Sequence, residues 1–174
     1  AVNASATYTG TVSGLTADSC DRATATCTGA NSASTVGPLF DEAICRTFQP
    51  AVSLTKDCDQ VLDETGNITV VVENTGNEPL TCNQPTDSFF ANSTVCADTG
   101  GTPLTLLPQI APFQLAVDGP DSTRTFTTTA TNFTSDSCDR ARITCTGNNS
   151  GQTTSDVDDA VCPAQCIPDF TVDK

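Results

Sequence analysis

The residues of this chain with the greatest capacity for covalent chemistry are its cysteines. Ten cysteines occur in 174 residues, and histidine is absent. An even number of cysteines in a short chain is typical of a disulfide framework formed in an oxidising compartment. Zinc is the alternative, but the sequence has neither a Cys-x-x-Cys pair nor a histidine. The sequence therefore predicts five disulfides, no metal and no cofactor.

Acidic residues form the second group that could do chemistry. Calcium sites need several oxygen ligands at defined spacings, and no EF-hand pattern occurs here. The sequence also lacks a histidine for a catalytic triad, a glycine-rich phosphate loop and a nucleophile elbow. We therefore expect no catalytic residues and no enzymatic activity. At the acidic clusters we expect solvated loops or local ion pairs. These clusters are Asp18 and Asp21, their later copies Asp136 and Asp139, and Asp156, Asp158 and Asp159.

The net charge restricts the partners of this chain. The formal charge is −14, with only seven lysines and arginines. Nucleic-acid binding requires clustered cations, so the composition argues against a nucleic-acid partner. No apolar run approaches the roughly 20 residues that span a bilayer, so we expect no membrane insertion.

An internal repeat organises the chain. Residues 5–29 align with residues 123–147 without a gap, and 14 of 25 positions are identical. Residues 41–45 match residues 158–162, and Pro50, Val52, Leu54 and Lys56 then match Pro168, Phe170, Val172 and Lys174. A repeat of this length is the signature of tandem supersecondary units. It predicts a partial unit at 1–49, a complete unit at 50–167 and a first strand of another unit at 168–174.

The strands that must position these residues follow from period-two alternation between turn residues. Seven strands are expected in the complete unit, with a less regular stretch around residues 89–107, and residues 5–45 should hold copies of the last three. Seven short strands with regular turns predict an all-β, immunoglobulin-like Greek-key β-sandwich. The expected ranges are 51–57, 67–73, 80–84, 113–117, 122–132, 141–147 and 157–162.

One part of the sequence resembles a known class of repeats. The strand 67–73 is followed by Asn74-Thr75-Gly76-Asn77, and the turn 118–121 precedes a threonine-rich strand. This pattern resembles the Thr-rich immunoglobulin-like repeats that occur in tandem in prokaryotic cell-surface proteins. The resemblance covers about residues 50–162 and implies a β-sandwich that serves as a spacer or stalk.

The partial unit predicts assembly. Three strands of a sandwich leave an apolar face and a strand edge uncovered, and such edges pair with other chains. We expect the strand with Phe170, Val172 and Lys174 to complete the partial unit of an identical neighbour, giving a head-to-tail homopolymer in an extracellular filament or surface appendage. The alternatives are a spacer segment of a longer tandem-repeat surface protein, an adhesin module, or a monomer whose first strands fold back onto the complete domain.

The repeat also suggests a disulfide connectivity. The last two strands of each unit should form a hairpin. The second cysteine of its first strand should then lie near the cysteine of its second strand. The first cysteine of its first strand should lie near the segment that follows the hairpin. The expected pairs are Cys20–Cys58, Cys27–Cys45, Cys82–Cys96, Cys138–Cys166 and Cys145–Cys162.

Five Asn-x-Ser/Thr sequons complete the candidate sites. Each permits N-glycosylation of a secreted protein, so surface glycans are expected on an extracellular or cell-surface chain. The asparagines are Asn3, Asn67, Asn92, Asn132 and Asn148.

Overall fold

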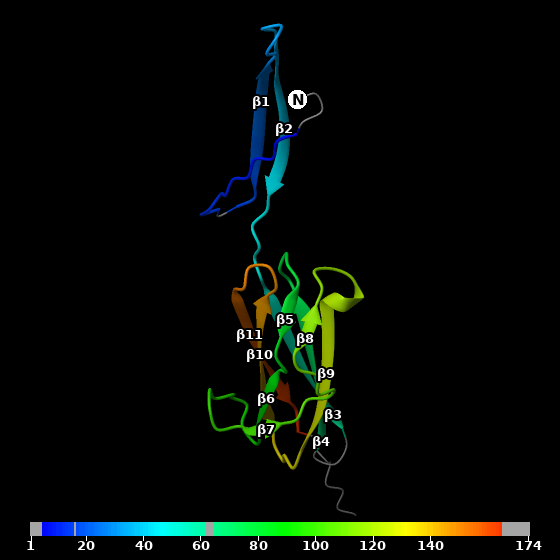
Figure 1. The fold of residues 1–174 in the computed structure, drawn as a ribbon. Coiled ribbons are helices and arrows are strands. Elements are labelled where there is room, and N and C mark those ends of the chain that lie inside the picture. Colours follow the sequence, from blue (N-terminus) through cyan, green and yellow to red (C-terminus); the bar gives the residue numbers. More distant parts are fainter. Residues whose placement is uncertain (1–4, 16, 62–64, 165–174) are drawn as a thin grey trace, which may run out of the picture. The chain divides into compact units, whose positions relative to one another are not determined.

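A computed structural model describes residues 5–15, 17–61 and 65–164 of the chain. The chain divides into two compact units, Ala1–Thr47 and Phe48–Lys174 (Figure 1). We call their described parts the hairpin unit (5–47) and the sandwich unit (48–164) and treat each by itself. The division lies two residues before the boundary expected from the repeat. The expected C-terminal strand, 168–174, lies outside the described residues.

The first sheet of the sandwich unit has three strands. β4 (Thr65–Asn74) lies in the middle and pairs antiparallel with β3 (Val52–Val61) and with β9 (Thr123–Thr131). β4 places Ile68, Val70 and Val72 on one face, where all three are fully buried. This alternation of buried and exposed residues is expected for a sheet with one face on a core.

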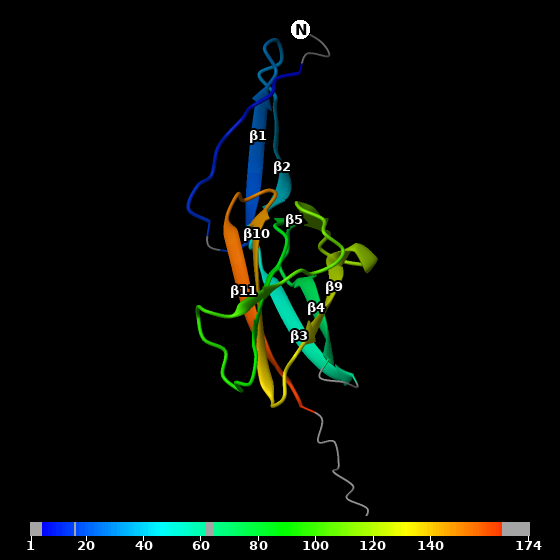
Figure 2. The same cartoon turned by 90° about the horizontal axis from the view of Figure 1, so that it is seen from below.

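The second sheet is built around β10 (Ser137–Gly147). One edge of β10 pairs along its length with β11 (Thr153–Cys162), and the other edge pairs with β6 (Thr86–Phe90) and then with β5 (Leu80–Cys82). β7 (Thr102–Leu104) pairs with β6, and β8 (Phe113–Leu115) pairs with β5. The two sheets form the layers visible in Figure 2, and the molecule is an all-β immunoglobulin-like sandwich.

The core fills the space between the two sheets. Phe126 and Phe133 are almost inaccessible to solvent, and Leu80 and Leu115 from the second sheet are fully buried. Two tilted ring pairs, Phe89–Phe133 and Phe113–Phe126, have centroids 5.5 and 5.3 Å apart. Such edge-on contacts add to the stabilisation that burial of the rings provides.

The seven expected strands of the sandwich unit are present, and two more occur in the stretch expected to be irregular. These are β6 and β7, which flank an excursion of the chain at residues 91–101. β5 and β6 run along the same edge of β10 and are separated by Asn83, Gln84 and Pro85. Proline cannot donate to a strand ladder, so it interrupts what would otherwise be one longer strand.

The Asn74-Thr75-Gly76-Asn77 turn fixes the beginning of β3. The backbone N–H groups of Thr75 and Gly76 donate to the carbonyl of Ala51, and Asn77 exchanges hydrogen bonds with the backbone of Gln49. A Cβ added at Gly76 would lie 2.5 Å from backbone atoms of Gln49 and Ala51, so the turn requires glycine here.

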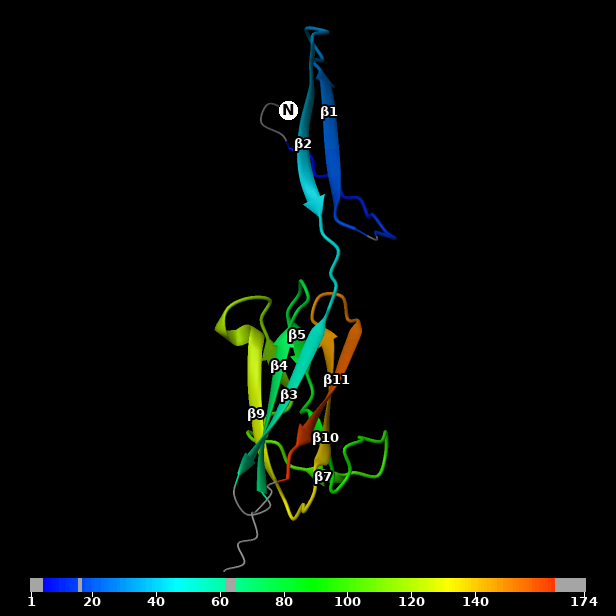
Figure 3. The same cartoon turned by 180° about the vertical axis from the view of Figure 1, so that it is seen from behind.

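The edge of β3 that faces away from β4 lies along β11 (Figure 3). The N–H groups of Leu54 and Lys56 donate to the carboxylates of Asp156 and Asp158, each at 2.8 Å. Because both residue numbers rise together, the two strands run parallel. Side-chain carboxylates thus satisfy the exposed donors of an edge strand, which would otherwise invite pairing with another chain.

The hairpin unit contains two strands, β1 (Ser19–Thr28) and β2 (Thr35–Cys45). The expectation of a third strand within residues 5–15 is wrong, since the structure has none there. The corresponding strand of the sandwich unit, β9, forms its ladder with β4, and the hairpin unit has no copy of β4. A strand without a neighbouring strand has no hydrogen-bond partners for its backbone N–H and C=O groups. Residues 5–15 therefore do not form a strand.

Among the described residues, no helix is long and apolar enough to cross a membrane.

The buried ring of Phe126 gives a test of the sandwich core. We expect Phe126→Ala to lower the free energy of unfolding by about 3–5 kcal/mol, because it removes a fully buried ring and leaves a cavity. Phe40→Ala is the matched control, because Phe40 is 65% exposed and belongs to the hairpin unit. Urea unfolding followed by circular dichroism measures both, and equal losses in the two variants would contradict the described core.

Candidate functional site

Three disulfides tie the sandwich unit together. Cys58–Cys162 joins β3 to β11, Cys82–Cys145 joins β5 to β10, and Cys96–Cys138 joins the excursion after β6 to β10. The bonds close segments with sequence separations of 104, 63 and 42 residues. Each closure of this kind contributes roughly 2–4 kcal/mol to stability, mainly by restricting the unfolded chain.

The expected pairs Cys27–Cys45 and Cys145–Cys162 are wrong because of hairpin register. Cys145 lies opposite Thr154 and Cys162 lies opposite Ser137, so these two cysteines occupy opposite ends of the hairpin. Cys27 and Cys45 are separated in the same way in the hairpin unit. Strand residues advance about 3.3 Å each, and a disulfide needs Cα atoms within about 7 Å.

The other three expected pairs are also wrong, since their cysteines have different partners. Cys58 bonds to Cys162 rather than to Cys20, and Cys82 bonds to Cys145 rather than to Cys96. Cys138 bonds to Cys96 instead of Cys166, and Cys166 lies outside the described residues.

The hairpin unit reproduces the β10–β11 hairpin but lacks the disulfides. Ser19 lies opposite Cys45 and Arg22 opposite Glu42, as Ser137 lies opposite Cys162 and Arg140 opposite Asp159. All three cysteines of the hairpin unit are free, with Cys20 and Cys27 exposed and Cys45 partly buried. Their copies in the sandwich unit, Cys138, Cys145 and Cys162, are all bonded to cysteines from other strands.

The hairpin unit therefore exposes a face that the sandwich unit buries. Asp139, Ala141 and Cys145 of β10 are at most 1% exposed, whereas their copies Asp21, Ala23 and Cys27 are solvent-exposed. A groove beside this face is lined by Val12, Leu15, Cys20, Asp21 and Cys45, among others. Large apolar side chains are also exposed in the hairpin unit, among them Tyr8, Val36, Leu39, Phe40 and Ile44.

A lysine and two aspartates lie inside the sandwich unit. Lys56 occupies an inward position of β3 between Leu54 and Cys58, while Asp87 and Asp139 point inward from β6 and β10. All three side chains are fully buried, with exposed fractions of 0%. No sequence pattern predicts this trio, and the sequence predicts a local pair of Asp139 with Arg140 instead.

The lysine lies close to both carboxylates. Lys56 Nζ donates to Asp87 Oδ1 at 2.5 Å and lies 2.8 Å from Asp139 Oδ2. Neither oxygen of Asp139 accepts a well-aligned hydrogen bond, and Asp87 Oδ2 has no donor either. Burial, followed by the charge of Asp87, raises the pKa of Asp139 to about 7, against the opposing effect of Lys56. Three ionised groups would leave a net negative charge in a dry core.

Three of the remaining acidic residues lie on a strand and make structural contacts, rather than lying in solvated loops. Asp156 and Asp158 lie on β11 and bond to β3, as described above. Asp159 accepts hydrogen bonds from Arg140 at 2.6 and 2.7 Å, which lower its pKa despite the opposing effect of burial. The expected ion pair of Asp21 with Arg22 is replaced by a cross-strand pair between Arg22 and Glu42.

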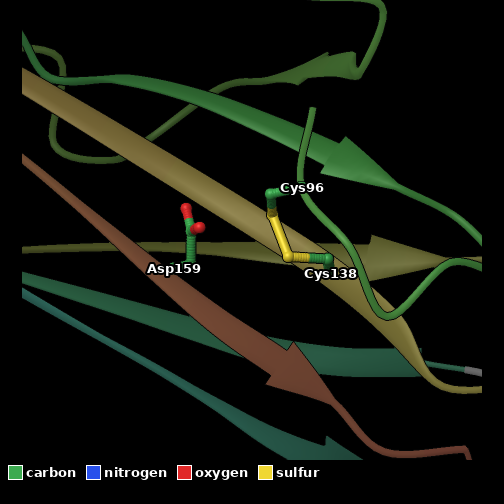
Figure 4. A group of neighbouring side chains, drawn as sticks. All are labelled: Cys96, Cys138 and Asp159. Atoms are coloured by element: carbon green, nitrogen blue, oxygen red, sulfur yellow. A yellow bond between two sulfur atoms is a disulfide. The ribbon is translucent and has the colours of Figure 1, made fainter. Parts of the chain in front are cut away.

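One group of side chains has the composition of a metal site. Cys96, Cys138 and Asp159 lie close together (Figure 4). The two sulfur atoms are bonded to each other, however, and Asp159 is held by Arg140. Metal ligation by cysteine requires a thiolate, so disulfide and ion-pair contacts account for this group.

A third buried carboxylate, Glu78, has the opposite environment to Asp139. Glu78 is fully buried and accepts hydrogen bonds from the N–H groups of Asn149 and Ser150 and from the Ser150 hydroxyl, at 2.6–2.9 Å. Burial acts to raise the pKa of Glu78, but the hydrogen bonds from Ser150 and Asn149 together lower it below its ordinary value. Glu78 thus anchors the β10–β11 turn to the start of β5.

Four of the five sequon asparagines lie at exposed positions. Asn67 is on β4, and Asn92, Asn132 and Asn148 are in turns or loops. The fifth, Asn3, lies outside the described residues. Exposure is what N-glycosylation requires, and the modification itself stays a prediction.

The cysteines give a direct chemical test. We expect alkylation without reduction to label Cys20, Cys27 and Cys45, while the six cysteines of the three disulfides react only after reduction. Differential alkylation of the full chain with peptide mass mapping measures this. Recovery of a Cys27–Cys45 or Cys145–Cys162 linked peptide would contradict the described strand register.

Glu78 gives a test that depends on pH. We expect Glu78→Gln to lower the free energy of unfolding by about 1–3 kcal/mol at neutral pH, because buried N–H donors lose a charged acceptor. Because the pKa of Glu78 is lower in the folded state, its carboxylate stabilises the fold fully at pH values above its ordinary pKa of 4.5. This stabilisation is lost as the pH falls through the pKa of the folded state. The difference in the free energy of unfolding between wild type and Glu78→Gln should therefore decrease as the pH is lowered. Urea unfolding across this pH range measures it, with exposed Glu73→Gln as the control.

No protein-family model and no curated protein matches this chain. Solved structures that are similar include the PapD-like (ASH) domain 7 of human CEP192, at 9% identity and a TM-score of 0.45, covering 67% of this chain and 87% of that one. The putative ApaA protein of Bordetella pertussis is similar at 16% identity and the same TM-score, covering 67% of this chain and 94% of that one. Likeness at this level assigns neither a family nor a function.

Proposed function

We propose that this protein is a non-catalytic structural subunit of an extracellular filament or surface appendage, in which subunits join head to tail by β-strand complementation. The observation that carries the proposal is the exposed face of the hairpin unit. That face copies a face that is buried in the sandwich unit, including the positions of Asp139, Ala141 and Cys145. The copy of a buried face that is exposed in the hairpin unit is a suitable binding surface for a partner that adds strands.

The C-terminal segment is the proposed donor. Its residues Phe170, Val172 and Lys174 match Val52, Leu54 and Lys56 of β3 in sequence. In the sandwich unit, Asp158 accepts from the N–H of Lys56, and Asp139 lies beside its amino group. The hairpin unit carries the matching carboxylates, Asp41 and Asp21. A donated strand would thus meet acceptors for its backbone and for the Lys174 amine.

The cysteines support an extracellular location. The three disulfides of the described residues are typical of an oxidising environment, where such bonds form and persist. Four exposed sequons and a net charge of −14 suit a solvated, glycosylated surface. We therefore place the protein outside the cell or at its surface.

A second arrangement is favoured by the free cysteines. The copies of Cys20, Cys27 and Cys45 bond to cysteines at 96, 82 and 58, which come from three different segments. Residues 168–174 contain no cysteine. A segment similar to residues 50–118, as in a long tandem-repeat surface protein, would complete both the strands and the disulfides.

The alternation of the donor strand provides the test. We expect the full chain to form head-to-tail polymers, and the double variant Phe170→Asp/Val172→Asp to remain monomeric, because both changes fall on the face that would be buried. Thr171→Asp changes the opposite face and is the matched control. Light scattering after size exclusion and negative-stain microscopy measure assembly.

A wild-type chain that stays monomeric at high concentration would contradict strand donation by this segment. Reactive thiols at Cys20, Cys27 and Cys45 on that monomer would instead support the tandem-repeat arrangement. Equal loss of assembly in Thr171→Asp would show that the effect comes from charge rather than from a buried apolar face.

A further inference from the structure

We propose that the sandwich unit forms an internal amide bond between the side chains of Lys56 and Asp139, with Asp87 as the proton acceptor. The link would join β3 of one sheet to β10 of the other. The inference rests on the position of the lysine between the two aspartates and is independent of how the protein assembles.

The geometry brings an amine and a carboxyl group together without water. Lys56 Nζ lies 2.8 Å from Asp139 Oδ2, and all three side chains have exposed fractions of 0%. Asp139 lies opposite Phe89 and Asp87 opposite Ala141, so the two aspartates are diagonal neighbours on adjacent strands with their side chains on one face. Intramolecular reactions between well-oriented groups reach effective concentrations of about 10⁵–10⁸ M.

The hydrogen bonding assigns different roles to the two aspartates. Asp87 Oδ1 accepts a charge-assisted hydrogen bond from Lys56 Nζ. Asp87 is therefore placed to take a proton from the ammonium group. Asp139 accepts no well-aligned hydrogen bond although the nitrogen lies beside it. The raised pKa of Asp139, about 7, keeps that carboxyl group protonated in mildly acidic solution, which is the form that an amine can attack.

The step balances without a co-reactant. Lys56 gives one proton to Asp87, and the neutral amine attacks Cγ of Asp139. The new C–N bond forms, the C–OH bond breaks, and a second proton from the nitrogen leaves with the hydroxyl group as water. Asp87 retains the first proton, so the amide replaces the ionised groups and no buried charge remains.

The physical advantage is the removal of charge from the core. Buried ion pairs repay their desolvation only when geometry and hydrogen bonding are complete, and here three carboxylate oxygens lack an aligned donor. An amide leaves a neutral N–H and C=O in their place. The surrounding core, which excludes water, also removes the reagent that would hydrolyse the bond.

Trypsin digestion of the full, reduced and denatured wild-type chain tests the proposal. Cleavage after arginine and lysine should give separate peptides 47–56, 57–124 and 125–140 if no link exists. With the link, Lys56 resists cleavage, and peptide 47–124 is joined to peptide 125–140 with the loss of one water molecule. The intact mass should be lower than that of the linear chain by the same amount.

The alternatives give distinct results. Release of peptide 47–56, together with an intact mass equal to that of the linear chain, would overturn the proposal. A water loss confined to peptide 47–124 would place the link on Asp87 and overturn the assignment to Asp139. Lys56→Arg and Asp139→Ala should restore the mass expected from their sequences, and Asp87→Ala should slow or abolish the water loss. Because the wild-type digest is decisive alone, a variant that fails to fold does not weaken the test.

Discussion

The closure of β3 against β11 is the constraint on which the sandwich unit depends. β3 has only β4 as a ladder partner, and its free edge is satisfied by two aspartate side chains instead of a strand. The same seam ends in the Cys58–Cys162 disulfide, and the inward face of β3 carries Lys56. One strand therefore brings together the edge contacts, a cross-sheet covalent bond and the buried charges.

The repeat explains why the hairpin unit looks unfinished. From Ser19 to Ala25, β1 pairs with β2 in the register that β10 has with β11, and cross-strand pairs such as Arg22 with Glu42 stabilise it locally. The register shifts between Ala25 and Cys27. The remaining contacts of the corresponding sandwich hairpin come from β3, β5 and β6. β5 and β6 have no second copy in this chain, and β3 has a sequence copy only at residues 168–174. Local structure is thus complete in the hairpin, whereas the tertiary structure that would cover it is not.

Sequence reasoning predicted the all-β class and the seven main strands because alternation and turn residues act over short distances. It failed for the disulfides, because connectivity depends on which strands become neighbours across the sheets, and Cys58 meets Cys162 only after both sheets have packed. Lys56 and Asp139 were equally hidden, since a charged residue at an inward position looks the same in sequence as one facing solvent. The only signal for Lys56 was its place in the alternation with Val52, Leu54 and Cys58.

The parallel course of β3 and β11 has a mechanical consequence. The chain enters β3 at Val52 and leaves β11 at Cys162, at opposite ends of these two parallel strands. Tension applied along the polypeptide would load the seam in shear, with its contacts resisting together rather than opening one by one. The bond between Cys58 and Cys162 would then carry the force directly from one strand to the other. Residues 59–161 would be bypassed and could not be extended while that bond stays oxidised.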